Sequence, residues 1–76
     1  MRSAKKIIAQ TNELARRIYA LRGYQVGQNH KFYEFARVNY HPDEQFAWEA
    51  ACVAQLLLTD TDVRDAFDEL DIKYHG

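Results

Sequence analysis

Residues 43–58 read Asp-Glu-Gln-Phe-Ala-Trp-Glu-Ala-Ala-Cys-Val-Ala-Gln-Leu-Leu-Leu, and this stretch decides the fold class. It contains neither glycine nor proline and is long enough for about four helical turns. Apolar residues recur at helical spacing, and the main stripe consists of Phe46, Ala50, Val53 and Leu57. A second stripe lies on another face and consists of Trp48, Cys52 and Leu56. A helix that is apolar on more than one side is usually central in its bundle, so we predict a central helix here.

Working outward, we predict a helix that begins after an N-cap at Ser3 and stops at Gly23. Its inward arc consists of Ile7, Leu14, Ile18 and Leu21, widened by Ala4, Ile8, Ala15 and Tyr19. The opposite arc is basic and consists of Lys5, Lys6, Arg16 and Arg17. This arrangement is typical of an amphipathic helix with its charged face in solvent.

Two more helices complete the prediction. One begins at Asn29 or His30 and turns four residues inward, namely Phe32, Phe35, Ala36 and Tyr40. Pro42 must either end that helix or open the next one, because proline lacks an N–H and clashes with the preceding turn. The last helix is predicted to be capped by Thr59, with Asp62 at the capping-box spacing. It buries Val63, Ala66, Phe67 and Leu70.

Length and composition agree with one all-α domain over residues 1–76, a small bundle of three to four helices. The chain has 76 residues, is 47% hydrophobic, and contains only four glycine and proline residues together. It is too apolar for a disordered tail and too poor in turn residues for an all-β sandwich. No apolar run is long enough to span a membrane, and no signal peptide is recognised. With a single cysteine, Cys52, the expectation is a cytoplasmic protein without disulfides.

Charge is divided unevenly along the chain. Residues 1–40 carry eight basic and two acidic side chains, a net charge of +6, and residues 41–76 carry two basic and nine acidic ones, a net charge of −7. We favour the interpretation that the halves attract each other within a compact fold. The alternative is a basic docking face for an acidic partner. The acidic half would repel phosphate, so nucleic acid is not an expected partner.

The sequence predicts neither an enzyme nor a metal or cofactor site. His30, His41, His75 and Cys52 share no metal-ligand spacing. Cys52 lies in mid-helix among small apolar residues, where cysteine is usually a buried hydrophobe. No glycine-rich phosphate loop follows a predicted strand.

One segment stands out, Tyr40-His41-Pro42-Asp43. The tripeptide His-Pro-Asp resembles the signature of J-domains, co-chaperone modules that stimulate ATP hydrolysis by 70-kilodalton heat-shock chaperones. Tyr40 and Tyr33 occupy positions where that family has aromatic residues. Downstream, the segments 54–60 and 64–68 resemble the end of the family's third helix and its short fourth helix. The resemblance covers about residues 31–70.

The resemblance implies a protein partner, a heat-shock chaperone. The signature His41, Pro42 and Asp43 would contact it, and Lys31 and Arg37 would add basic contacts from the second helix. Arg64 and Asp68 would act structurally, through helix packing and an ion pair. The same tripeptide is also an efficient helix start, because proline suits the first helical position and acidic residues stabilise the positive helix end. Both interpretations stay open at this point.

A second functional hypothesis is a small helical protein that associates with itself, as a homodimer. Its basis is the second stripe of Trp48, Cys52 and Leu56. A bundle of this size has little surface with which to cover such a stripe, and an uncovered apolar stripe is typical of an interface.

Overall fold

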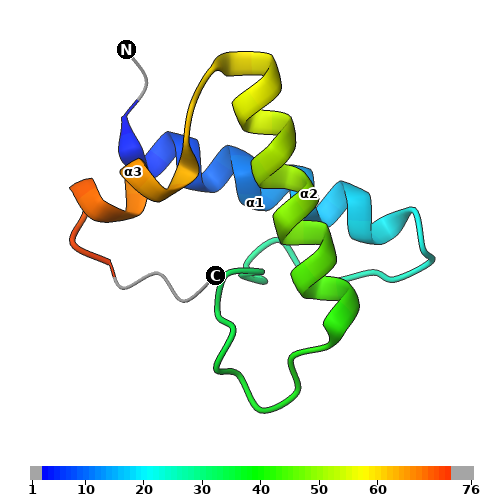
Figure 1. The fold of residues 1–76 in the computed structure, drawn as a ribbon. Helices are drawn as coiled ribbons and strands as arrows, with labels where there is room; N and C mark the ends of the chain where they lie inside the picture. Colours follow the sequence, from blue (N-terminus) through cyan, green and yellow to red (C-terminus); the bar gives the residue numbers. More distant parts are fainter. Residues whose placement is uncertain (1–2, 73–76) are drawn as a thin grey trace.

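The computed structural model describes residues 3–72, and within them the chain forms three helices and no strand. The helices are α1 (Ala4–Ala20), α2 (Pro42–Thr59) and α3 (Val63–Glu69), and α2 crosses α1 (Figure 1). The prediction of a small all-α bundle is confirmed. His75 lies outside the described residues.

Helix α1 begins as predicted, with the Ser3 side chain accepting a hydrogen bond from the Lys6 backbone N–H at 3.2 Å. Four of its five buried residues belong to the set that was predicted to widen the inward arc, and Thr11 is the fifth. The buried residues are Ala4, Ile8, Thr11, Ala15 and Tyr19. Ile7, Leu14 and Ile18 are partly buried at the edges, and Leu21 lies past the end of the helix, largely exposed.

Helix α2 turns a different face inward from the one predicted. Its buried residues are Glu44, Ala47, Trp48, Ala51 and Gln55. The predicted main stripe lies outside instead, with exposed side chains at Phe46, Val53 and Leu57. Thr11 and Gln55 explain part of this orientation of α2, because the Gln55 amide donates a hydrogen bond to the Thr11 hydroxyl at 3.1 Å between the two helices. The prediction that the Phe46 stripe faces the core is therefore wrong.

Trp48 anchors the core. Its ring is fully buried and lies against Tyr33 and Phe67, with centroid separations of 5.3 and 6.0 Å. Tyr33 also meets Phe67 edge-on at 5.3 Å. Edge-to-face contacts at these separations stabilise aromatic pairs beyond the area they bury. Trp48 is thus a core residue within a single chain and is not available to a second copy, which corrects its assignment to an uncovered stripe.

No helix forms over residues 29–40. The backbone there makes successive turns in which Glu34 bonds to Lys31, Arg37 to Glu34, and Tyr40 to Arg37. The segment is held by tertiary contacts instead, and it buries Phe32 completely. Phe35 and Tyr40 are partly buried, and Ala36 is exposed. Its many aromatic residues have modest helix propensity, so tertiary contacts determine the backbone.

Helix α3 is capped by Asp62 rather than by Thr59. The Asp62 carboxylate accepts from the Arg64 backbone N–H at 2.9 Å, whereas Thr59 is the last residue of α2 and its hydroxyl donates to the Gln55 carbonyl. Asp60 follows in the left-handed conformation, with φ +54°, and ends α2. Val63, Ala66 and Phe67 are buried as predicted, and Leu70 is half-buried just after the helix.

Candidate functional site

The His-Pro-Asp segment is the beginning of α2. His41 is the N-cap residue and Pro42 the first helical residue. The His41 Nδ1 accepts from the Asp43 backbone N–H at 3.0 Å, which requires the ring proton to be on Nε2. In return the Glu44 carboxylate accepts from the His41 backbone N–H at 2.9 Å. The local backbone is that of the helix-start interpretation.

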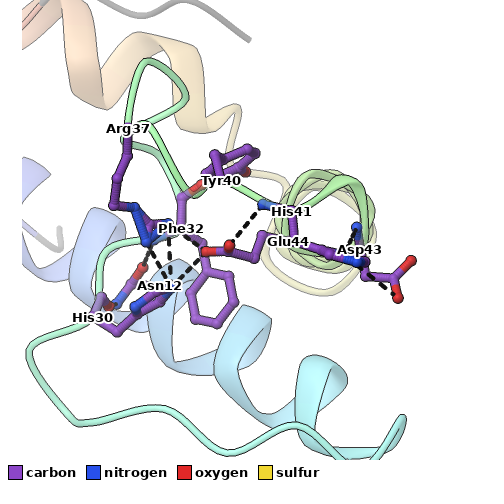
Figure 2. Close-up of polar contacts among 8 residues, drawn as sticks. All are labelled: Asn12, His30, Phe32, Arg37, Tyr40, His41, Asp43 and Glu44. Carbon is purple, nitrogen blue, oxygen red and sulfur yellow. Dashed lines mark hydrogen bonds and ion pairs between the residues drawn. The ribbon is translucent and has the colours of Figure 1, made fainter.

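Glu44 is the centre of a polar cluster beneath this helix start (Figure 2). Its side chain is almost completely buried, and its Oε1 lies 2.6 Å from the His30 Nε2. The Arg37 guanidinium pairs with the same oxygen and lies over the Tyr40 ring. A buried carboxylate is tolerated only with such partners, so the cluster ties the segment 29–40 to the start of α2.

A second set of bonds ties the same segment to α1. The Asn12 amide donates to the His30 carbonyl at 2.7 Å, and its oxygen accepts from the Phe32 backbone N–H at 2.8 Å. The Tyr40 hydroxyl donates to the Phe32 carbonyl at 2.6 Å. These bonds replace the helical ones that the segment lacks (Figure 2), since buried backbone groups need partners.

The outer side of the helix start is more open. The Tyr24 hydroxyl donates to the Asp43 carboxylate at 3.1 Å, and this bond raises the pKa of Tyr24 above its usual value of 10. The Tyr24 ring stacks on Tyr19, and burial raises the pKa of Tyr19 as well. His41 keeps about half of its side-chain exposure and Asp43 a third. Both remain accessible at the surface.

The other residues implied by the J-domain resemblance are dispersed. Lys31 is exposed but lies in the turn segment, and Arg37 is committed to Glu44, so the two do not form a basic helical face. Arg64 and Asp68 are exposed on α3. Of the five residues that the resemblance assigns to the chaperone contact, only His41, Pro42 and Asp43 lie together.

The second candidate surface is the outer stripe of α2, which consists of Phe46, Ala50, Val53 and Leu57. Phe46 is 54% exposed, Val53 55% and Leu57 77%. Leu56 beside it and Leu58 at the end of α2 are also exposed. Of the residues first proposed for self-association, Leu56 therefore lies at this surface, Cys52 is half-buried at its edge, and Trp48 lies in the core.

A groove of about 340 Å³ continues this surface toward α3. Its floor is largely apolar, and its rim carries charged groups on both helices. The lining residues are Glu49, Cys52, Val53, Leu56, Asp62, Val63 and Arg64. The apolar area is thus wider than a single helical stripe.

Sequence reasoning missed the polar cluster of His30, Arg37 and Glu44, and also Asn12. One signal was present, because Glu44 follows His41 at the three-residue spacing of a capping box. Nothing local marks Asn12, whose partners lie 18 and 20 residues further along the chain.

Comparison with protein-family models, with curated proteins and with solved structures finds no significant match. Over residues 3–72, no helix combines the length and apolar character that crossing a membrane requires. The same part of the chain contains no group of three His, Cys, Asp or Glu side chains placed to hold a metal ion.

Proposed function

We propose that this chain is a protein–protein interaction module whose contact surface is the outer stripe of α2. One observation carries the proposal. The helix buries a face that includes Glu44 and Gln55 while it leaves Phe46, Val53 and Leu57 in solvent. Contiguous exposed apolar patches on small domains typically mark interaction sites.

The chemistry of the stripe supports binding of another apolar helix or groove. Complete burial of an aliphatic or aromatic side chain contributes about 1.5–3 kcal/mol. Phe46, Val53 and Leu57 retain half or more of their exposure, so a partner that covers them gains a substantial part of that free energy. The spacing of the stripe, 46, 50, 53 and 57, alternates four and three residues, as in helices that pack side by side.

We further propose that the module has no catalytic role and is cytoplasmic. The cluster of His30, Arg37 and Glu44 is occupied in holding the turn segment to α2. A single cysteine, Cys52, agrees with a reducing compartment, since secreted domains of this size usually depend on disulfides.

The proposal is tested with a photo-activated cross-linking amino acid at position 53, in cells that express the protein. We expect covalent adducts from position 53 and none from position 38, because Val38 lies in the turn segment, outside the stripe. Val38 is a matched control, since it is equally apolar and 97% exposed. Equal labelling at both positions, or no adduct from position 53, would contradict the proposal.

A chaperone contact is the second candidate function, and it rests on His41 and Asp43, which lie side by side at the surface. In the J-domain family that the segment resembles, this tripeptide is itself the contact. The helix-start geometry assigns both residues a structural role in addition, so a test must separate capping from recognition.

The substitution His41→Asn separates the capping role of His41 from a role in chaperone recognition. Asparagine is a strong N-cap residue, so His41→Asn should leave the melting temperature almost unchanged. If the chaperone contact exists, the wild type raises the ATPase rate of a 70-kilodalton chaperone from the same cell and His41→Asn does not. A wild-type protein that leaves the ATPase rate unchanged would refute this candidate.

A further inference from the structure

The outer stripe of α2 is nearly symmetric about its own midpoint. Positions 46 and 57, and positions 50 and 53, are equidistant from a point between residues 51 and 52. When two copies of α2 are placed side by side in opposite directions, Phe46 of each copy therefore meets Leu57 of the other. Ala50 of each copy likewise meets Val53. In both pairs, Phe46 with Leu57 and Ala50 with Val53, a larger side chain meets a smaller one, which favours close packing between facing helices.

Charge at the two ends of the stripe fits the same arrangement. At the amino end, the Arg22 guanidinium lies over the Phe46 ring, 5.5 Å from its centroid. At the carboxyl end, Asp60, Asp62 and Asp65 follow Leu57 and are exposed, and with the exposed Arg64 among them this end is still net negative. The helix dipole adds positive charge at the first end and negative charge at the second. Opposite directions bring unlike ends together, whereas parallel copies would bring like ends together.

Like charges approach at each end of the paired stripe, because the same two-fold symmetry sets Asp43 of one copy opposite Asp60 of the other. Glu49 and Leu56 lie on the same side of the stripe, and in the antiparallel arrangement Glu49 of one copy faces Leu56 of the other. Asp43 at the amino end is turned toward Tyr24, whose hydroxyl donates to it. The apolar part of the surface is thus complementary to itself, the condition for a two-fold dimer.

We infer that the partner of the outer stripe is a second copy of this chain, packed antiparallel through Phe46, Ala50, Val53 and Leu57 of each copy. The inference rests on the proposed function and names its partner. Arg22 and the acidic residues that follow α2 set the direction of the pairing. The paired surface is a short one, so we expect association in the micromolar range.

The first test is sedimentation equilibrium of the whole chain. The wild type should be a dimer in the upper micromolar range, and Val53→Glu should weaken dimerisation at least about tenfold because it buries an unpaired charge. Val38→Glu is the matched control and should have no effect. Circular dichroism melts of both variants verify that they fold. A wild type that remains monomeric at about 1 mM overturns the inference.

The direction of pairing is tested by disulfide formation in a Cys52→Ser background. Ala50→Cys and Val53→Cys proteins are mixed and oxidised, and the mixed disulfide should exceed either symmetric one, because only facing positions bring the Cα atoms within about 7 Å. Dominance of the symmetric Ala50→Cys product would indicate parallel helices and contradict the arrangement.

Arg22→Glu provides an independent variant that leaves the apolar stripe intact. The negative charge at position 22 would face the acidic end of the other copy and repel it. Because salt screens this repulsion, the variant should weaken the dimer more at low salt than at high salt. Lys6→Glu is the control, since it changes net charge equally on the exposed face of α1. Equal effects of the two variants would overturn the role of Arg22. A monomeric wild type whose position 53 still cross-links another protein would refute the second copy and leave the interaction module standing.

Discussion

Replacing Trp48 with alanine should lower the free energy of unfolding by about 3–5 kcal/mol, because it opens a cavity at the centre of the core. Trp48 is fully buried between Tyr33 and Phe67, and three segments of the chain meet at these rings. Small domains have only about 5–15 kcal/mol of stability in total. Urea denaturation followed by circular dichroism measures the loss.

Phe46→Ala is the matched control, an aromatic truncation two residues away on the opposite face of α2. At dilute protein concentration it should change the free energy of unfolding by less than about 1 kcal/mol, because Phe46 is half exposed. A loss from Phe46→Ala as large as that from Trp48→Ala would mean that the outer stripe belongs to the core after all.

Replacing Glu44 with alanine should cost about 3 kcal/mol, the lower end of the range for breaking a buried ion pair. The substitution removes the acceptor for Arg37 and His30 and the acceptor for the His41 backbone N–H. We expect the segment 29–40 to lose its order before the helices unfold. Amide hydrogen exchange at Phe32, whose N–H bonds to Asn12, should report that loss.

Asp43→Ala is the control, because Asp43 is the adjacent carboxylate in the first turn of α2 but is partly exposed. It should lose about 0.3–1 kcal/mol of helix-dipole stabilisation and the exposed hydrogen bond from Tyr24, and so cost clearly less than Glu44→Ala. Equal costs for the two substitutions would show that Glu44 acts merely as a helix-terminal charge and does not hold the polar cluster together.

The helices α1, α2 and α3 could be predicted from the sequence because their signals are local. Ser3, Pro42 and the apolar run after Pro42 mark helix ends and interiors within a few residues. The inward face of α2 could not be predicted from hydrophobicity, since the helix is apolar on several sides. Its orientation depends on Trp48 filling the core and on the bond between Gln55 and Thr11, two residues 44 positions apart.

The helix predicted from residue 29 failed for the same physical reason. The spacing of Phe32, Phe35, Ala36 and Tyr40 fits a helix, but Asn12 binds the backbone at His30 and Phe32 in an arrangement that a helix would disrupt. Long-range contacts thus override a local pattern. Part of the candidate site could be found from its capping spacing. The outer stripe could also be found from its spacing, but its exposure to solvent could not be predicted without the inward face of α2.

The outer stripe is exposed in a single copy, and in the proposed dimer it is covered. Hydroxyl-radical footprinting over a range of protein concentrations measures both. We predict rapid labelling of Phe46 and Leu57 in dilute solution, progressive protection with concentration, and constant labelling of Val38. Protection of Phe46 and Leu57 already in dilute solution, or labelling that does not change with concentration, would contradict the account.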